Sequence, residues 1–307
     1  MKSTILITGI TGFLGSSIGE ILCKNEYRVI ATKRKTSNLK NCIEYSGNVI
    51  WIDLDMYSWK ENIVAFEPEI IIHAAWKGVE LDERNNWEAQ INNILFFQDL
   101  LEIAKKSKTK KIIALGSQAE YGHFDKVVSE NQPLKSTTAY GVTKIIISQL
   151  LEGFSKENKI EWYWLRIFSI YGEKQSTIWL LPSVIVNIGK TDLTSMDFSK
   201  GEQKYSYLYI QDFSMAILKI VQHTQKSSGF YNISASKLIS IKDIVTYIRD
   251  YINPLFILNF GVFPYRNNQL MHIVGDTKKF RKVFGEIEST TFEIAITNII
   301  KFHMSQK

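Results

Sequence analysis

Cysteine and long apolar runs are what this sequence has least of. It contains two cysteines among 307 residues, Cys23 and Cys42, and they form no CxxC pair. Without paired cysteines there is no disulfide framework, and free thiols are typical of a reducing compartment. No apolar run approaches the roughly 18 residues of a transmembrane helix, and the run after Lys2 is too short for a signal peptide. We therefore expect a cytoplasmic protein without a membrane partner.

The sequence also lacks the ligand spacings of a metal site and a strong excess of one charge. None of its five histidines stands in an HExxH or similar pattern, so we expect no metal. The formal net charge is +6, from 37 basic and 31 acidic residues. The basic cluster at 105–111 follows a predicted helix, at the end where cations stabilise the helix dipole. We therefore expect a solvated basic surface and not a nucleic-acid interface.

What the sequence does have is a regular alternation of apolar strands and amphipathic helices. The longest predicted helices cover about 87–106 and 139–156. The predicted strands lie at 5–7, 28–32, 49–53, 69–73, 110–115 and 161–167. Apolar strands that alternate with helices are typical of a parallel sheet covered on both faces. The pattern predicts an α/β fold, a Rossmann-type doubly wound parallel sheet followed by a smaller C-terminal α/β substrate lobe.

The alternation becomes less regular after Tyr171, which suggests a second unit. We predict a dinucleotide-binding domain over residues 1–170, to which 205–225 returns. Residues 171–307 would then form the substrate-binding lobe. Ligands are expected at the carboxyl ends of the strands, between the two units.

A glycine triplet stands between the first strand and the first helix. Gly9, Gly12 and Gly15 are spaced three apart. Glycine permits a tight turn and lets backbone N–H groups of a helix N-terminus approach a phosphate. A turn that contains glycines by chance is the alternative, but the position between strand and helix favours nucleotide binding.

Tyr140 and Lys144 are four residues apart and so share one face of a predicted helix. A cation beside a phenol lowers the pKa of the phenol and makes tyrosine a usable acid or base near neutrality. Ser117, which follows a predicted strand, could hold the same reacting oxygen. Taken alone, such a Tyr/Lys pair is most often ordinary surface chemistry.

Taken together and in this order, the motifs resemble the extended short-chain dehydrogenase/reductase superfamily, the NAD(P)-dependent nucleotide-sugar epimerases and dehydratases. The TGxxGxxG motif corresponds to Thr8–Gly15 and the YxxxK motif to Tyr140–Lys144, while Ser117 precedes Tyr121 in an S-x-x-x-Y-G stretch. Further similar stretches lie at 53–54, 73–75, 165–172, 201–212 and 229–233. The resemblance covers nearly the whole chain and implies a nucleotide-sugar substrate.

The resemblance also implies roles for single residues. Tyr140 would exchange a proton with a sugar oxygen while a hydride moves between the sugar carbon and the cofactor. Ser117 would hydrogen-bond that oxygen, and Lys144 would hold the nicotinamide ribose and bias Tyr140. Besides Tyr140 and Lys144, cofactor binding is expected for Gly9, Thr11, Gly12, Phe13, Leu14, Gly15, Asp53, Leu54, Ala74, Ala75, Trp76 and Asn92. Substrate binding is expected for Gln118, Ser169, Trp179, Lys204 and Arg266.

One departure from the family pattern concerns the cofactor. Members that use NAD usually carry an acidic residue after the second strand, where this chain has Lys33 and Arg34. Cations at that place suit the 2′-phosphate of NADP. We therefore expect NADP, with NAD and a basic loop that does not touch the cofactor as the alternative.

A second departure concerns the reaction. Sugar 4,6-dehydratases need an Asp-Glu pair beside the active-site hydroxyl, where this chain has Gln118 and Ala119. Neither can carry a proton. Glu120 comes one residue later, and in an extended segment it would point to the other face. Dehydration is therefore disfavoured, and simple redox chemistry is left.

A third departure concerns the grip on the substrate. Ser169 stands where many relatives have Asn, and Tyr205-Ser206 stands where many have Arg-Asp. That arginine often touches a substrate phosphate in the family. Another residue must therefore contact the substrate phosphate, and Lys204 and Arg266 are the candidates.

The favoured function is NADP-dependent reduction of a nucleotide-activated 4-keto-6-deoxy sugar at C4, in deoxysugar or surface polysaccharide biosynthesis. The stretches at 73–78 and 116–122 resemble 4-ketoreductases of the CDP-abequose synthase type. One alternative is a nucleotide-sugar 4-epimerase with tightly bound NAD, and another is a dinucleotide-binding sensor or scaffold without activity. By analogy with relatives we expect a homodimer through the helices near 87–106 and 139–157.

Overall fold

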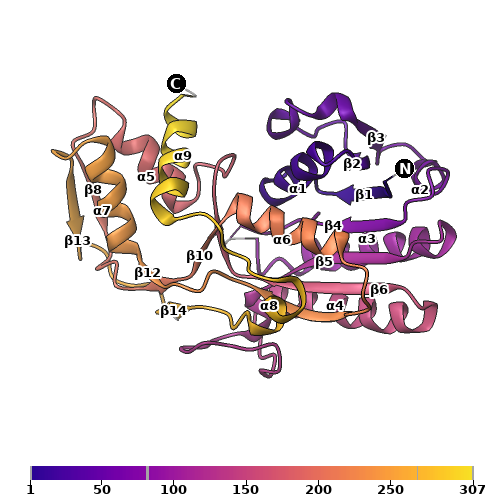
Figure 1. Ribbon diagram of the computed structural model, residues 1–307. Coiled ribbons are helices and arrows are strands. Elements are labelled where there is room, and N and C mark those ends of the chain that lie inside the picture. Colours follow the sequence, from indigo (N-terminus) through magenta and orange to yellow (C-terminus); the bar gives the residue numbers. More distant parts are fainter. Residues whose placement is uncertain (1, 81–82, 268, 306–307) are drawn as a thin grey trace.

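A seven-stranded parallel sheet forms the centre of the computed structural model, which describes residues 2–80, 83–267 and 269–305 (Figure 1). Its strands are β1 (Thr4–Thr8), β2 (Arg28–Lys33), β3 (Val49–Asp53), β4 (Ile70–His73), β5 (Lys111–Ser117), β6 (Glu161–Ile167) and β11 (Gly229–Ile233). Their order across the sheet is β11-β6-β5-β4-β1-β2-β3. The chain runs outward from β1 to β3 and then crosses back to β4 on the other side of β1. Ligands of such sheets bind at this reversal, beyond the carboxyl ends of the strands.

Helices cover both faces of this sheet. The helices concerned are α1 (Phe13–Lys24), α2 (Trp59–Val64), α3 (Trp87–Lys106), α4 (Ala139–Asn158) and α6 (Ile210–Gln222). The first and last of them pack against each other on one face, and the other three cover the opposite face (Figure 1). Ile5 and Ile7 of β1 point into the core on the first face, and Leu6 between them points into the core on the second. Strands buried on both faces are apolar throughout, and the predicted doubly wound Rossmann-type fold is confirmed.

The C-terminal part of the chain forms a smaller α/β layer beside the sheet (Figure 1). Helix α5 (Leu180–Ile188) packs against α7 (Ile241–Ile252) and α9 (Phe292–Met304). The short strands, which pair among themselves, are β7 (Ser169–Tyr171) with β10 (Tyr207–Tyr209), β8 (Ser195–Phe198) with β13 (Ile257–Phe260), and β9 (Lys204–Tyr205) with β12 (Ile239–Ser240) and β14 (His272–Ile273). The remaining elements are α8 (Lys278–Phe284) and the 3₁₀ helices η1 (Lys40–Cys42), η2 (Ser46–Asn48) and η3 (Gln118–Tyr121).

The chain passes between the two parts more than once. The predicted return at 205–225 contains α6, which packs on α1. The large sheet also takes β11, at 229–233, which the predicted return does not include. No helix among the described residues is long and apolar enough to span a bilayer.

The buried side chain of Lys111 links the end of α6 to the sheet. Lys111, the first residue of β5, donates through Nζ to the carbonyl oxygens of Ile220 (2.9 Å) and His223 (2.7 Å). These carbonyls close α6, where the helix itself supplies no donors and where a positive charge is favoured. Lys111 therefore holds in place a helix that covers the same face of the sheet as the Gly-rich turn.

Candidate active site

Two positions at the turn between β1 and α1 require glycine. Gly9 has a φ of +73°, and a Cβ placed on it would lie 2.5 Å from the backbone nitrogen of Ala75. A Cβ on Gly15 would lie 2.1 Å from the carbonyl oxygen of Gly9. Helix α1 starts at Phe13, and its N-cap Gly12 offers no side chain to the first N–H groups. Those groups stay available to an anion, so the turn fits the pyrophosphate of a dinucleotide.

The connection between β2 and β3 supports this turn. The sequence motifs did not reveal this support. Asn41 donates through Nδ2 to the carbonyl oxygen of Thr11 at 3.2 Å. The Tyr45 hydroxyl donates to the carbonyl oxygen of Ser16, in the first turn of α1, at 2.8 Å. Cys42, between them, is buried.

The residues expected around the adenosine lie together at the ends of β2 and β3. Lys33 and Asp53 are partners in the parallel register, and the Leu54 N–H donates to the carbonyl oxygen of Lys33 at 2.8 Å. Lys33 is half-buried and Arg34 is exposed. Since β2 lies next to β1, these two cations stand at the same edge of the sheet as the Gly-rich turn.

The structure brings Ser117, Tyr140 and Lys144 together from two neighbouring elements. Ser117 ends β5 and caps η3, while Tyr140 and Lys144 lie one turn apart at the start of α4. Lys144 donates through Nζ to the carbonyl oxygen of Leu115 at 2.6 Å, which ties α4 to the end of β5. The Ser117 hydroxyl lies beside the Tyr140 phenol. A hydroxyl, a phenol and an ammonium therefore meet at the carboxyl edge of the sheet.

Tyr140 is only 8% exposed, and this burial affects the acidity of its phenol. Burial raises the pKa of Tyr140, whereas the Ser117 hydroxyl and the Arg84 guanidinium lower it and the Glu120 charge raises it further. The expectation of a phenol whose pKa lies near neutrality is wrong here, because lost hydration outweighs the nearby cation. The cation that opposes this effect is Arg84, a residue that sequence reasoning missed.

Lys144 is held on the face of an indole. Its Nζ lies 3.4 Å above the ring centre of Trp76, close enough for a strong cation–π contact. Trp76 is fixed in turn, since its Nε1 donates to Oε1 of buried Gln90 at 2.9 Å. Burial lowers the pKa of Lys144 to about 7, and the Glu120 charge opposes that shift. The Lys144 ammonium can therefore lose its proton near neutral pH.

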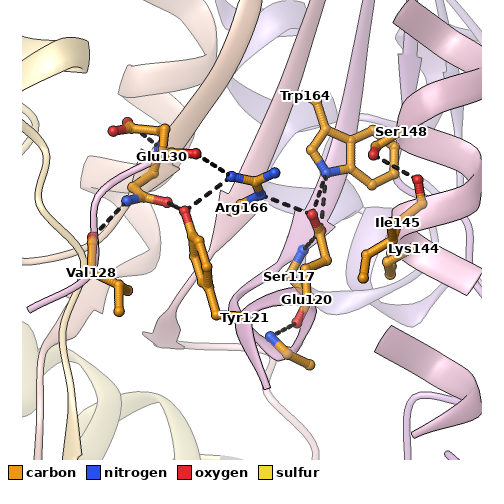
Figure 2. A network of polar contacts seen from close by, with 12 residues as sticks. Ser117, Glu120, Tyr121, Val128, Glu130, Lys144, Ile145, Ser148, Trp164 and Arg166 are labelled. Carbon is orange, nitrogen blue, oxygen red and sulfur yellow. Dashed lines mark hydrogen bonds and ion pairs between the residues drawn. The ribbon is translucent and has the colours of Figure 1, made fainter. Parts of the chain in front are cut away.

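Glu120 is turned away from the reacting groups, as expected, but for a different reason. It lies in η3 and not in an extended segment, and its carboxylate accepts from Trp164 Nε1 and Arg166 Nε, both at 2.9 Å (Figure 2). The same carboxylate accepts from the Ser117 N–H at 2.7 Å. The side chain is buried, and burial raises the pKa of Glu120 while the Arg166 charge lowers it. Glu120 therefore fixes the loop that carries Ser117.

These features occur in the order of a known family. A sequence model of the NAD dependent epimerase/dehydratase family matches residues 5–234, a range that includes the Gly-rich turn, Ser117, Tyr140 and Lys144. The chain belongs to this family.

Individual relatives share moderate sequence identity with this chain, and a solved structure shares its fold. A putative UDP-glucose 4-epimerase of Methanocaldococcus jannaschii is 27% identical over 256 residues, which are 81% of this chain and 82% of that protein. A CDP-abequose synthase of Yersinia pseudotuberculosis is 24% identical over 282 residues, 91% of this chain and 94% of that one. In fold, the chain is similar to a UDP-N-acetylglucosamine 4-epimerase of Methanobrevibacter ruminantium solved with UDP-N-acetylmuramic acid. Their TM-score is 0.89 at 20% identity, over 100% of both chains.

One predicted cofactor residue of this family member lies elsewhere. Asn92 is exposed on α3, while its neighbour Asn93 is buried and binds both backbone polar groups of Lys77, at 2.9 and 3.0 Å. One helical step turns a side chain by about 100°. Asn92 therefore lies on the exposed face of α3, and its role in cofactor binding stays a prediction.

Two residues predicted to contact substrate lie near one tyrosine. Lys204 is exposed at the start of β9, and Tyr205 follows it half-buried, with its hydroxyl donating to the carbonyl oxygen of Leu270 at 3.1 Å. Burial raises the pKa of Tyr205, and the nearby charge of Arg266 lowers it. Arg266 is exposed. Both predicted cations therefore lie near Tyr205.

The other predicted substrate residues lie on separate elements. Gln118 opens η3, next to Ser117, and its Oε1 is buried and accepts from no described residue. Ser169 begins β7, which continues from the end of β6, and Trp179 is the N-cap of α5. Gln118 is thus the predicted substrate residue nearest to the reacting groups along the chain.

Proposed function

We propose that this chain reduces a nucleotide-activated 4-keto-6-deoxy sugar at C4 with NADP(H), in the biosynthesis of deoxysugars or surface polysaccharides. The observation that supports it is the meeting of Ser117, Tyr140 and Lys144 beside a glycine turn that fits a pyrophosphate. The family assignment and the similarity to CDP-abequose synthase agree with it.

Residues of the first domain would hold the dinucleotide. The turn at 9–15 would bind the pyrophosphate, Asp53 and Leu54 would flank the adenine, and the segment 74–76 would line the nicotinamide side. Lys33 and Arg34 would bind a 2′-phosphate. When bound, the cofactor supplies the hydride that the sugar carbon takes up.

The chain's own residues would handle the proton. Tyr140 donates to the sugar oxygen, and Ser117 hydrogen-bonds the same oxygen. No dehydration accompanies the reduction, because Gln118 and Ala119 cannot act as general acid or base. The Glu120 carboxylate is paired with Arg166. This chemistry separates a reductase from the 4,6-dehydratases.

Cofactor choice can be measured by fluorescence titration with NADPH and NADH. We expect NADPH to bind more tightly to the wild-type protein, and we expect the double variant Lys33→Ala/Arg34→Ala to lose this preference. Lys40→Ala, an exposed lysine in the same connection, serves as the control and should keep it. Tighter binding of NADH to the wild-type protein would contradict NADP(H) as the cofactor.

Activity is tested by incubating the protein with NADPH and a panel of 4-keto-6-deoxy sugars activated by dTDP, CDP, UDP or GDP. Mass spectrometry should find a product with two additional hydrogens for at least one nucleotide. The Tyr140→Phe variant should form none above background. A complete panel without product would reject the reductase.

A 4-epimerase with tightly bound NAD is the second candidate. It is favoured by the similarity to the putative UDP-glucose 4-epimerase of Methanocaldococcus jannaschii. Such an enzyme would be purified with NAD and would convert UDP-sugars without added cofactor. Absorbance of the denatured supernatant, followed by mass spectrometry, distinguishes the two candidates.

We also propose that the chain forms a homodimer through α3 and α4, which pack side by side. Both helices expose large apolar side chains about one turn apart, Trp87, Ile91 and Leu95 on α3 and Ile146 and Leu150 on α4. Light scattering after size exclusion should give twice the chain mass. Leu95→Lys should shift it to monomer, whereas Leu255→Lys, an exposed leucine elsewhere, should leave it unchanged.

A further inference from the structure

Arg84 lies against Tyr140 but belongs to none of the motifs. Its guanidinium carbon is 5.2 Å from the centre of the Tyr140 ring, within the range of a cation–π contact. The Arg84 carbonyl oxygen accepts from the Tyr140 N–H at 2.8 Å, and Asn85 Oδ1 accepts from the Ala139 N–H at 3.3 Å. Both N–H groups belong to the first turn of α4, where the helix has no acceptor of its own. The segment that carries Arg84 is therefore hydrogen-bonded to the start of α4, the helix that carries Tyr140 and Lys144.

The side chain of Arg84 is also anchored. Its Nε donates to the carbonyl oxygen of Val79 at 2.9 Å. Gln90, which is buried, donates through Nε2 to the carbonyl oxygen of Gly78 at 2.8 Å and so fixes the start of the same segment. Arg84 is half-buried, and its guanidinium is held by this one hydrogen bond on the side chain and lies near the Tyr140 ring.

Lys144, the cation of the family motif, is occupied elsewhere. Its Nζ donates to Leu115 and sits on the Trp76 ring, and it is 5.8 Å from the centre of the Tyr140 ring. Because burial lowers the pKa of Lys144 to about 7, this group loses part of its charge near neutral pH. A guanidinium keeps its charge throughout that range.

We propose that Arg84 is a positioning residue of the site, whose guanidinium stabilises the negative charge that Tyr140 carries after it gives up its proton. The proposal rests on the proposed function for the identity of the acceptor. In this step the phenol O–H bond breaks, the proton joins the sugar oxygen, and the electron pair stays on Tyr140 as phenolate. Water then returns the proton. A buried phenolate without a cation over its ring would be costly.

The charges around Tyr140 come from three elements. Lys144 lies near its ring from α4 and Arg84 from the segment before α3. Glu120 of η3 points away from the ring and acts on it only through its charge. The Glu120 charge is paired with Arg166. Among the described residues, Arg84 is the cation closest to the Tyr140 ring, at 5.2 Å against 5.8 Å for Lys144.

The proposal is tested on the phenol itself, without substrate or cofactor. Tyr140 is replaced by 3-fluorotyrosine, whose lower pKa brings the titration into the pH range of the folded protein, and the ¹⁹F shift is followed against pH. Arg84→Met should raise the pKa of this phenol by roughly one unit or more, because an opposite charge at this distance is removed. Arg84→Lys should restore most of the shift, and Lys77→Met, an exposed cation of the same segment, should not move it.

Two results would overturn the proposal: a titration of Arg84→Met that matches the parent, or one of Arg84→Lys that matches Arg84→Met. Arg84→Gln repeats the charge removal with a polar side chain, should Arg84→Met fold poorly. Once a sugar substrate is found, Arg84→Met should lower kcat about tenfold and leave KM within twofold. A shifted titration in a protein that reduces no sugar would reject the proposed function while supporting the role of Arg84.

Discussion

The two ends of the candidate site are built in different ways. The proposed cofactor end, at the turn between β1 and α1, is made of backbone that has no room for side chains at Gly9 and Gly15. The proposed substrate end, around β9 and the segment after β13, presents the exposed side chains of Lys204 and Arg266. A backbone requirement admits one amino acid, whereas a surface cation can be moved or exchanged. We therefore expect substitutions at the first end to be tolerated far less than substitutions at the second.

The largest expected effect is on the reacting phenol, between the two ends. Tyr140→Phe should lower kcat about 10³-fold, because the variant lacks only the general acid, and should leave the cofactor Kd within about twofold. Stopped-flow kinetics and fluorescence titration measure the two quantities. Tyr57→Phe is the matched control, since Tyr57 is fully exposed and should change neither. Turnover close to wild type in Tyr140→Phe would exclude Tyr140 as the proton donor.

The next effect concerns the backbone of the cofactor end. A Cβ at Gly15 would lie 2.1 Å from the Gly9 carbonyl oxygen, so Gly15→Ala must displace the turn. We expect the cofactor Kd to rise about 100-fold, which corresponds to about 2.7 kcal/mol. Gly153→Ala, on α4, is the control, because nothing lies within 4 Å of its added Cβ. It should keep the affinity and raise the free energy of unfolding by about 0.5–1 kcal/mol. Equal cofactor affinity in both variants would contradict a turn that tolerates only glycine.

The same contrast explains what could be predicted from the sequence. Uninterrupted apolar strands revealed the doubly wound sheet, and the glycine spacing and the Tyr140–Lys144 step identified residues that meet in space. These features follow from periodicity and sterics, which act between neighbours in the chain. The choice between Asn92 and Asn93 could not be made in this way, because a single residue decides which way a helical side chain faces.

What the sequence could not give depends on contacts between distant segments. Arg84 reaches Tyr140 because the segment before α3 supplies acceptors to the start of α4, a pairing across more than 50 residues that leaves no local pattern. The raised pKa of Tyr140 follows from burial, which the YxxxK spacing does not encode. Tyr45 supports the Gly-rich turn in the same way, across 29 residues.

A smaller effect should appear in the pH dependence of stability at the cofactor end. His73 accepts or donates a hydrogen bond with Thr8 at 2.9 Å, and burial, followed by the Lys144 charge, lowers the pKa of His73 from 6.5 to about 3. Between these values the unfolded chain binds a proton that the folded chain does not, so stability falls as the pH falls. This group should cost about 2 kcal/mol of unfolding free energy between pH 7 and pH 5.

Urea unfolding at the two pH values isolates that contribution. The difference between pH 7 and pH 5 should shrink by about 2 kcal/mol in His73→Asn and stay unchanged in His123→Asn, whose histidine is exposed. An unchanged difference in His73→Asn would mean that His73 is not held neutral by its surroundings.

The smallest expected effect lies at the substrate end, where charges are exposed and screened by water. Arg266→Ala should raise KM for the sugar nucleotide about fivefold and leave kcat unchanged, because a charge-assisted contact to a diphosphate is lost before the chemistry begins. Lys204→Ala should act less, since a lysine offers no two-pronged contact to phosphate oxygens. Lys278→Ala, an exposed cation on α8, is the control and should change neither constant. If Arg266→Ala instead lowered kcat by as large a factor as Gly15→Ala raises the cofactor Kd, the two ends would be equally rigid. The contrast between fixed backbone and adaptable surface would then fail for this chain.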